Sequence, residues 1–171
     1  MKVRIIEVKS KKNVTAIIRE GISKELPSIH DNWTFNFNKQ LRSLKNSKAF
    51  ILETEEEPGV VQGCMIFQMI DKEIPNLAFI EVAPHNRNEV KKYDHIAGCL
   101  IAFAFKQSLL LAKGDYNGLL FLDVKEEDVA NQNKLMSVYS SKYNAELCGE
   151  TTMLISDEGG RHLIEKYLKD N

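Results

Sequence analysis

The chain has 171 residues and a formal net charge of −1, with 43% hydrophobic and 27% charged residues. This length predicts a single domain, residues 1–171, that can bury a sizeable core, and the composition is ordinary for a globular protein. The near-neutral charge gives no general attraction to nucleic acid or to an anionic membrane surface. We therefore expect neither of them as a partner.

The cysteines Cys64, Cys99 and Cys148 lie far apart in the sequence, and no Cys-x-x-Cys pair exists. This spacing argues against a zinc cluster, and no His-x-x-x-His pair is present, so we expect no metal. Free thiols fit a reducing compartment. The first residues lack an apolar signal-peptide core, and the longest apolar run, Ile96–Phe105, is too short to span a membrane. The expected location is the cytoplasm.

The first half of the chain predicts two helices and four strands. The first helix is expected because apolar residues recur at helical spacing until Pro27. The turn sequence Glu56-Glu57-Pro58-Gly59 and the short connections predict that the last three strands form an antiparallel meander. The expected elements are a strand at Val3–Val8, a helix at Val14–Leu26, a short helix at Asn38–Asn46, and strands at Lys48–Thr54, Val60–Ile70 and Ala78–Val82.

The sequence of the second half predicts three helices and three strands. The helix from Ile96 is apolar on most sides and is therefore expected to be buried. It joins Ala78–Val82 to the apolar run Gly118–Val124, so these two strands should be parallel in a β–α–β unit. Further on we expect a helix at Glu126–Lys142, strands at Glu146–Cys148 and Thr152–Ile155, a break at Gly159-Gly160, and a helix at Arg161–Lys169.

The junction between the third meander strand and the apolar helix has the pattern of a phosphate site. Pro84 ends the strand, a polar loop with Lys91 and Lys92 follows, and His95-Ile96-Ala97-Gly98-Cys99 begins the helix. A helix start presents unpaired N–H groups and a partial positive charge, which suit a phosphate. The alternative is a surface loop in front of a core helix.

This junction resembles the acetyl-CoA signature of the GNAT superfamily of N-acetyltransferases, which is Val-x-Pro, a loop, then (Gln/Arg)-x-x-Gly-x-(Gly/Ala). Val82-Ala83-Pro84 matches the first part and Lys92–Ala97 falls on the second. Lys92 departs from Gln or Arg, and His95 departs from the first Gly. The resemblance implies a GNAT-like mixed α/β (α+β) sheet, with an antiparallel meander, a β–α–β unit and helices on both faces. The coenzyme-binding residues it implies are Val82, Ala83, Lys92, Tyr93, Asp94, His95, Ile96, Ala97, Gly98 and Cys99.

The resemblance also implies a general acid. Many members have a tyrosine near the thioester sulfur, in the helix before the terminal strands, and Tyr139 occupies that place here. We assign Tyr139 as the acid that protonates the leaving thiolate. The alternative is a tyrosine that packs on the core.

Glu81 is the candidate base, since it lies in an otherwise apolar strand where burial would make its carboxylate more basic. The alternatives are a carboxylate on the solvent face or one paired with a lysine, and His85 or His95 as the base. By resemblance, the backbone N–H of Val82 or Ala83 polarises the thioester carbonyl.

These features favour an N-acetyltransferase that moves an acetyl group directly from acetyl-CoA to a primary amine, on a small molecule rather than on a protein. The aromatic residues Trp33, Phe35 and Phe37 either line the substrate pocket or pack beneath a loop, and we favour packing. The sequence leaves a homodimer open. The alternative function is an inactive coenzyme-binding or protein-interaction module on the same fold, because His95 replaces a glycine and Ala145 replaces an aromatic residue of the family pattern.

Overall fold

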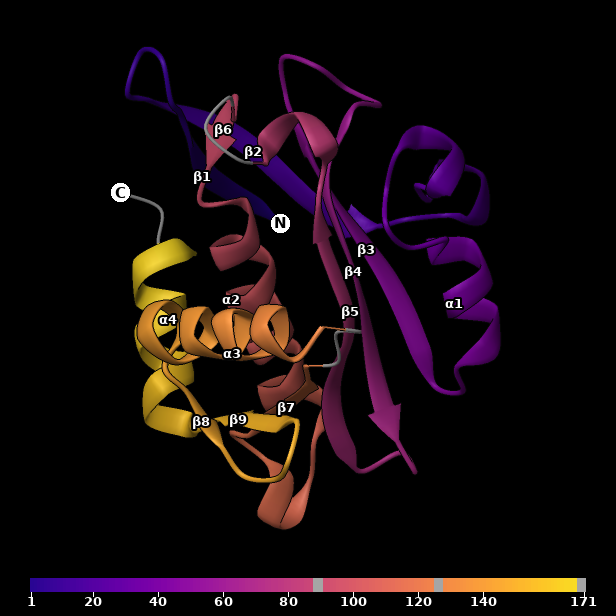
Figure 1. Ribbon diagram of the computed structural model, residues 1–171, viewed down its shortest axis with the longest axis vertical. Coiled ribbons are helices and arrows are strands. Elements are labelled where there is room, and N and C mark those ends of the chain that lie inside the picture. Colours follow the sequence, from indigo (N-terminus) through magenta and orange to yellow (C-terminus); the bar gives the residue numbers. More distant parts are fainter. Residues whose placement is uncertain (88–90, 125–127, 169–171) are drawn as a thin grey trace.

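The computed structural model describes residues 1–87, 91–124 and 128–168. In this part of the chain one mixed sheet has the strand order β6-β1-β2-β3-β4-β5-β7-β9-β8, with helices packed against it (Figure 1). The strands are β1 (Lys2–Glu7), β2 (Lys12–Glu20), β3 (Ser47–Thr54), β4 (Val61–Ile70), β5 (Ile74–Val82), β6 (Tyr93–Asp94), β7 (Leu120–Asp123), β8 (Ala145–Leu147) and β9 (Thr152–Ile155). The α-helices are α1 (Phe37–Ser43), α2 (Ile96–Leu111), α3 (Val129–Tyr143) and α4 (Asp157–Tyr167), and short 3-10 turns lie at Ser23–Glu25, Ile29–Asp31, Pro84–Asn86 and Gly114–Tyr116.

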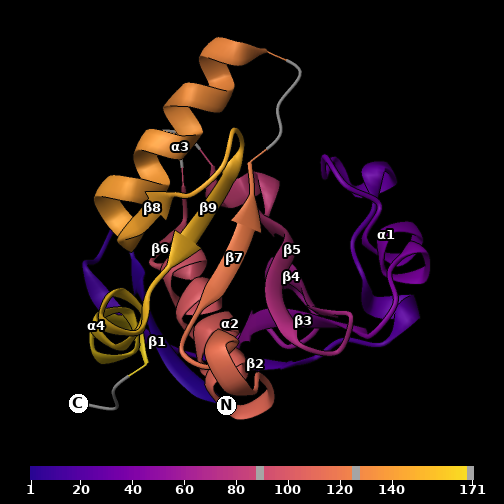
Figure 2. The same cartoon turned by 90° about the horizontal axis from the view of Figure 1, so that it is seen from below.

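The sheet buries apolar side chains on both faces, because successive residues of a strand point to opposite sides. In β3, Ala49 and Ile51 join the cluster under α1, whereas Phe50 and Leu52 join the larger cluster around α2. Helix α1 lies on one side of the sheet and α2 on the other (Figure 2). The expected helices on both faces are therefore confirmed.

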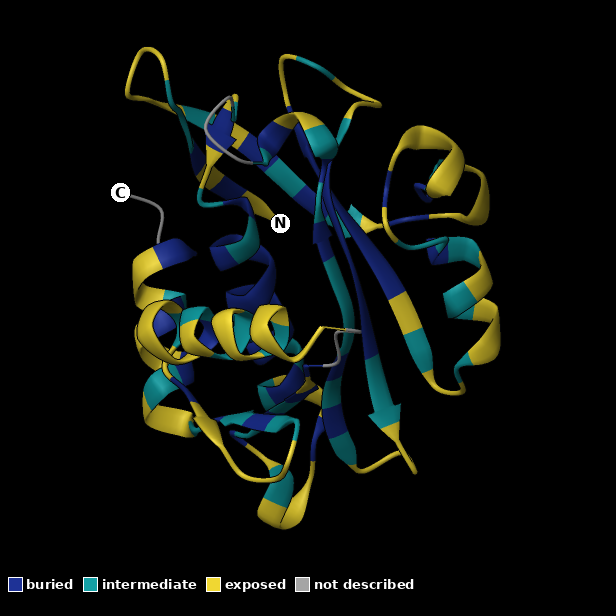
Figure 3. Ribbon diagram, in the orientation of Figure 1, coloured by how far each residue is buried: buried dark blue, intermediate teal, exposed yellow. Residues whose placement is uncertain are grey.

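The expected meander and β–α–β unit are also confirmed. Strands β3, β4 and β5 pair antiparallel, and β5 pairs parallel with β7. Between them, α2 has Leu100, Ile101 and Phe105 fully buried, and Figure 3 shows it as a mostly buried helix beside a more exposed α3. The apolar run on α2 is thus the centre of the main core.

The predicted helix at Val14–Leu26 is wrong. Residues Lys12–Glu20 form β2, which pairs antiparallel with both β1 and β3. Ala16 and Ile18 are buried while Thr15 is exposed, so the buried positions of β2 recur every second residue, as in a strand. The β-branched residues of this segment favour a strand, and pairing on both sides outweighs the weaker helical spacing.

The predicted break at Gly159-Gly160 is also wrong, because both glycines lie inside α4. Ser156 caps the helix, and its hydroxyl accepts the N–H of Gly159. A Cβ on Gly160 would lie 2.2 Å from the ring of Phe105, so this glycine lets α4 pack against α2. The expected helix start at Glu126 and helix end at Lys169 lie outside the described residues.

Candidate active site

Strands β5 and β7 stay together for a short distance and then diverge. Their parallel pairing joins Asn76 to Phe121 and Leu77 to Leu122. The next residue, Ala78, is an extra residue in β5, since Phe67 of β4 faces Leu77 and the preceding β4 residue already faces Phe79. Such a β-bulge bends a strand and increases its twist. The bulge therefore accounts for the separation of the two strands beyond Leu77.

A cavity of about 420 Å³ opens at this divergence, and we refer to it as the cleft. Its walls come from β5, β7, α3 and the segments that flank α1. Most of them are apolar and a few are polar, which is the usual make-up of a small-molecule site. The lining residues are Phe35, Leu44, Gln68, Asn76, Leu77, Ala78, Phe79, Ile80, Leu122, Asp123, Val124, Leu135 and Tyr139.

The three aromatic residues before and at the start of α1 divide between the two expected roles, packing under a loop and lining the pocket. Trp33 and Phe37 are 7% and 0% exposed, and they pack edge to face with ring centroids 5.9 Å apart. Phe35 instead lines the cleft and packs against Phe79 of β5. Packing holds for two of the three residues, and Phe35 contributes to the candidate site.

Tyr139 lies on the cleft wall and is 9% exposed. It sits in the last turns of α3, where the chain leaves the helix through Asn144 in the left-handed conformation. The N–H of Asn144 donates to the carbonyl of Tyr139 and so fixes this end of the helix. The ring of Tyr143 lies 6.0 Å from that of Tyr139, and burial raises the pKa of Tyr143.

Glu81 is buried, and its carboxylate accepts three donors. The N–H groups of Thr34 and Phe35 donate to it at 2.6 and 3.1 Å, and the Arg87 guanidinium forms an ion pair with it. A carboxylate has about four acceptor positions, so three are already used. The arrangement favours a tether that holds the segment before α1 onto the end of β5, and the base role stays a prediction.

The two expected backbone donors differ in where they point. The N–H of Ala83 donates to the carbonyl of Gln62 at 2.9 Å, so it belongs to the pairing of β5 with β4. Neighbouring residues in a strand direct their backbone groups to opposite sides, so the N–H of Val82 points to the open edge of β5. The carbonyl of Val82 accepts from Arg87 at 2.8 Å. A donor role for Ala83 does not fit this pairing, and Val82 remains the candidate.

The residues just before α2 are held by structural contacts. Tyr93 lies in β6, is 2% exposed, and donates its N–H to Asn86. The Lys92 ammonium donates to Glu57 at 2.7 Å and lies 4.9 Å from the centre of the Tyr93 ring. Asp94 accepts from Lys91 and from the N–H of the next residue, both at 2.8 Å. Lys92, Tyr93 and Asp94 thus stabilise the approach to the helix.

The start of α2 leaves backbone donors rather than side chains for an anion. His95 has a φ of 71°, a left-handed conformation that glycine adopts at lower cost, and burial lowers the pKa of its imidazole. Gly98 lies under the Tyr167 ring. The Cys99 sulfur lies 3.6 Å from the carbonyl oxygens of both Arg4 and Tyr167, and its single S–H donates to one of them at a time. The first helical turn, residues 96–98, presents the N–H groups that the helix itself does not use.

His85 lies outside the cleft. Its hydrogen bond to Gln62 determines which of its ring nitrogens carries the proton. The N–H of Tyr93 donates to Asn86 Oδ1 at 3.0 Å, so the Asn86 amide nitrogen faces Gln62 and donates to Gln62 Oε1 at 2.7 Å. The same oxygen lies 2.7 Å from His85 Nε2, which therefore carries the proton. Burial lowers the pKa of His85. This histidine lines a separate hollow with Lys9, Lys91 and other charged residues.

Asp123 is a cleft residue that the sequence analysis missed. It ends β7, lines the cleft, and accepts the Thr151 hydroxyl at 2.5 Å. The available signal was an acidic residue at the end of the apolar run Gly118–Val124. An exposed aspartate at a strand end is common, so this signal alone could not single it out.

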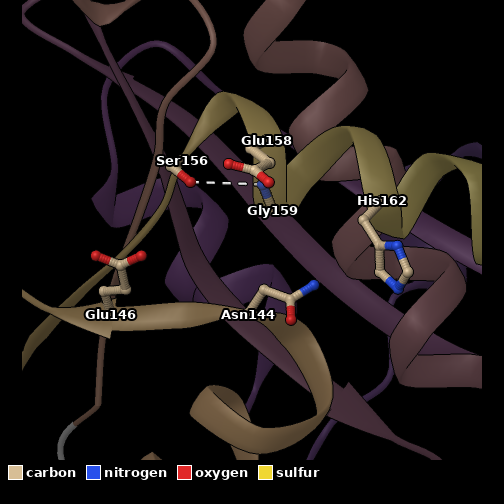
Figure 4. A pocket seen from close by; sticks show the side chains of 6 residues that line it. All are labelled: Asn144, Glu146, Ser156, Glu158, Gly159 and His162. Carbon is tan, nitrogen blue, oxygen red and sulfur yellow. Dashed lines mark hydrogen bonds between the residues drawn. The ribbon is translucent and has the colours of Figure 1, made fainter.

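A second hollow of about 330 Å³ lies where α4 begins and is separate from the cleft. Figure 4 shows its lining side chains around the turn between β9 and α4, with the hydroxyl of Ser156 accepting the N–H of Gly159. None of the predicted site residues lines it. The lining residues are Asn144, Glu146, Ser156, Glu158, Gly159 and His162.

No helix among residues 1–87, 91–124 and 128–168 combines the length and the apolar character needed to cross a bilayer. In the same part of the chain, no three His, Cys, Asp or Glu side chains converge as metal ligands would.

Comparison with known proteins supports the fold. Neither protein-family models nor curated protein sequences match the chain. A structure of AtaTR bound with acetyl-CoA has a TM-score of 0.57 at 15% identity, over 87% of this chain and 98% of the other. A chimera of the spermidine N-acetyltransferase SpeG from Vibrio cholerae has a TM-score of 0.54 at 15% identity, over 85% and 98%. The N-acetyltransferase PseH from Campylobacter jejuni, in complex with acetyl coenzyme A, has a TM-score of 0.50 at 13% identity, over 82% and 99%. The chain therefore has the fold of the GNAT superfamily of N-acetyltransferases.

Proposed function

We propose that this protein is an acetyl-CoA-dependent N-acetyltransferase that transfers the acetyl group directly to a primary amine. The observation that carries the proposal is the cleft at the divergence of β5 and β7, with Tyr139 on its wall. It lies in a fold shared with acetyltransferase structures that hold acetyl-CoA.

The residues of this chain fit the coenzyme in two places. One edge of β5 pairs with β4. The opposite edge pairs with β7 at Asn76 and Leu77 and is open beyond Leu77. An extended pantetheine chain can bind such an edge as an added strand would. The N–H groups of residues 96–98 at the start of α2 suit the pyrophosphate.

In the proposed reaction, the amine nitrogen attacks the thioester carbonyl carbon, a C–N bond forms and the C–S bond breaks. The N–H of Val82 stabilises the negative charge that develops on the carbonyl oxygen. The Tyr139 hydroxyl gives its proton to the leaving thiolate. The ammonium loses a proton before attack, directly or through water, and Glu81 or solvent accepts it. As the amide forms, the attacking nitrogen loses a second proton, which returns to the Tyr139 oxygen through solvent.

A module without turnover is the second candidate, and two observations favour it. His95 takes the place of a glycine and packs against Tyr167 with ring centroids 5.3 Å apart. The carboxylate of Asp94 already accepts the N–H of His95, so an anion of the chain itself lies near the helix start. Both features would weaken, but not prevent, phosphate binding there.

Calorimetric titration with acetyl-CoA and with desulfo-CoA tests the proposal. We expect both ligands to bind with dissociation constants in roughly the micromolar range. The proposed binding contacts are made to the pantetheine chain and the pyrophosphate, and the sulfur contributes little to them. A thiol-release assay with a panel of primary amines then looks for turnover. Binding with no thiol release from any amine would favour the inactive module. No binding at a protein concentration of about 100 μM would overturn the proposal.

A further inference from the structure

We infer that Phe35 contacts the acceptor and determines its specificity, and that the acceptor carries an aromatic group next to its primary amine. The inference rests on the proposed function, because it assigns the acceptor of that same cleft. It concerns the part of the cleft that faces α1.

The cleft has walls on both faces of the sheet. One set of lining side chains packs with the main core around α2, and its members are Leu77, Ile80, Leu122, Val124, Leu135 and Tyr139. A second set packs with the cluster under α1, and its members are Phe35, Leu44, Ala78 and Phe79. We call the space beside the first set the α3 half of the cleft and the space beside the second set the α1 half.

The bulge in β5 produces this division. Side chains of a regular strand alternate between the two faces of a sheet, but Ala78 and Phe79 both pack on the α1 side, because Ala78 is the extra residue. Leu77 and Ile80, which flank this pair, pack with the main core. The cleft therefore passes from one face of the sheet to the other at the point where β5 leaves β7.

A direct transfer needs room for both reactants at the reacting carbon. Tyr139, the proposed acid for the leaving thiolate, lies in the α3 half, so the thioester sulfur belongs on that side. The α1 half then receives the second reactant, which is the amine. This assignment places the acceptor beside Phe35 and Phe79.

Phe35 is fixed in the wall of the α1 half before any ligand binds. Its N–H donates to the Glu81 carboxylate at 3.1 Å. Its ring packs edge to face against those of Phe79 and Phe37, with centroids 5.1 and 6.1 Å apart. The Phe35 side chain is still only partly buried, so part of its surface is open to the cleft. A contact surface fixed in advance costs little conformational entropy on binding.

The walls of the α1 half select an aromatic group. Two phenyl rings, from Phe35 and Phe79, stand beside the apolar side chains of Leu44 and Ala78. A bound ring gains from edge-to-face or offset contact with these rings and from the burial of its apolar area. A hydroxyl group against the same walls would lose its hydration, and these four side chains offer it no hydrogen bond.

The inference can be tested without coenzyme. Ligand-observed NMR on the full chain compares phenethylamine with ethanolamine, which has the ammonium group but no ring. We expect the wild type to bind phenethylamine about ten-fold more tightly than ethanolamine, and Phe35→Ala to remove most of this preference. The control is Leu41→Ala, which shortens a partly buried side chain of the same cluster outside the cleft lining. Equal binding of the two amines by the wild type, or an equal loss of preference in the two variants, would overturn the inference.

Phe35→Leu removes the ring and keeps an apolar side chain in the cluster. This variant should bind phenethylamine about three-fold more weakly than the wild type does. It carries the same test if Phe35→Ala does not fold. A Phe35→Leu protein with the wild-type preference for phenethylamine would contradict the aromatic contact.

Turnover gives the second readout. With acetyl-CoA present, Phe35→Ala should lower kcat/KM by about ten-fold for phenethylamine and by less than about three-fold for ethanolamine. An equal fall for both amines would indicate a structural role alone and would contradict the inference. The affinity of Phe35→Ala for acetyl-CoA, measured by calorimetry, should equal that of the wild type. If acetyl-CoA fails to bind while phenethylamine still binds in a Phe35-dependent way, the proposed function fails and the amine site stands.

Discussion

In the proposed mechanism, Tyr139 gives its proton to the leaving thiolate. Its side chain is 9% exposed and fixed near the end of α3. Tyr139→Phe removes the hydroxyl and keeps the ring, so the packing of the cleft wall should persist. We predict that kcat falls by about 100-fold while the affinity for acetyl-CoA stays within about two-fold, measured by thiol release and calorimetry.

Tyr143→Phe is the matched control for this substitution. Its ring lies 6.0 Å from that of Tyr139, but Tyr143 does not line the cleft. We expect its kcat to stay within about three-fold of the wild type. Equal loss of kcat in both variants would contradict the assignment of the acid to Tyr139.

Glu81 permits a prediction about stability. Glu81→Gln replaces an acceptor oxygen by an NH₂ donor, which faces either the N–H groups of Thr34 and Phe35 or the Arg87 guanidinium. Because the side chain is 8% exposed, we predict a loss of about 2 kcal/mol in the free energy of unfolding, measured with urea.

Glu73→Gln, in the turn before β5, is the control for Glu81→Gln and should change stability by less than about 0.5 kcal/mol. If Glu81 is a tether, the pH–rate profile of Glu81→Gln keeps its shape. Loss of one limb of that profile, with stability unchanged, would instead identify Glu81 as the base.

The sequence pointed to individual candidate residues where a local pattern carried them. Tyr139 was singled out by a family pattern, and Glu81 by its apolar neighbours in the strand, which left both a buried and a solvent-facing carboxylate open. The engagement of the Ala83 N–H depends on the register between β5 and β4, and the place of Asp123 depends on where β7 ends relative to α3. Register and strand divergence are tertiary properties, and no local pattern reports them.

At the scale of elements, the contact between α2 and α4 depends on a glycine. Ala is the better helix former by about 1 kcal/mol, yet a Cβ at Gly160 would lie 2.2 Å from the Phe105 ring. We predict that Gly160→Ala lowers the free energy of unfolding by about 1–3 kcal/mol, since overpacking outweighs the propensity.

Gly159→Ala serves as the comparison, because a Cβ there would lie 3.1 Å from Asn144 and asks for a smaller shift. We expect its cost to be below that of Gly160→Ala by about 1 kcal/mol or more. A stabilised Gly160→Ala protein in thermal unfolding would show that α4 does not pack on α2 as described.

Each element that the sequence predicted correctly carries one dominant sequence pattern. The apolar stretch on α2 and the turn between β3 and β4 each point to a single structure. Strand β2 carried two signals, helical spacing and β-branched residues, and pairing with β1 and β3 decided between them. The two-residue strand β6 exists through its pairing with β1, which is distant in sequence.

At the scale of the whole molecule, an ion-pair cluster ties the segment before α1 to the sheet. Arg19 of β2 bonds Glu53 of β3 at 2.8 Å and Glu25 at 2.9 Å. The hydrogen bond from Arg19 lowers the pKa of Glu25 from 4.5 to about 2, and the same guanidinium lowers the pKa of Glu53. Both carboxylates therefore bind protons more weakly in the folded chain than in the unfolded one.

This difference makes stability depend on pH. A group with a lowered folded-state pKa contributes stability above about pH 4.5, and that contribution is lost as the pH falls towards the folded value. We predict that the melting temperature of the wild type falls between about pH 5 and pH 2. The Arg19→Met variant should have a lower melting temperature than the wild type at neutral pH. Its melting temperature should fall less between about pH 5 and pH 2. If the melting temperatures of the wild type and Arg19→Met fell in parallel with pH, the prediction would be contradicted. The control is Arg42→Met, on α1, which should show the same pH dependence as the wild type.

The overall order of strands and helices was predictable because length, turn signals and the apolar helix together restrict the topology. The meander, the parallel pair and the covered sheet follow from these signals. The additional strand β2 next to β1 and the packing of α4 on α2 required knowledge of which distant residues meet.

The most direct test of the central claim is a crystal structure of the protein with acetyl-CoA. The account predicts that the pantetheine chain lies along the open edge of β5, with the thioester sulfur within roughly 4 Å of the Tyr139 hydroxyl. The pyrophosphate should contact the N–H groups of residues 96–98. A coenzyme bound in another hollow, or a sulfur directed away from Tyr139, would contradict the proposed mechanism.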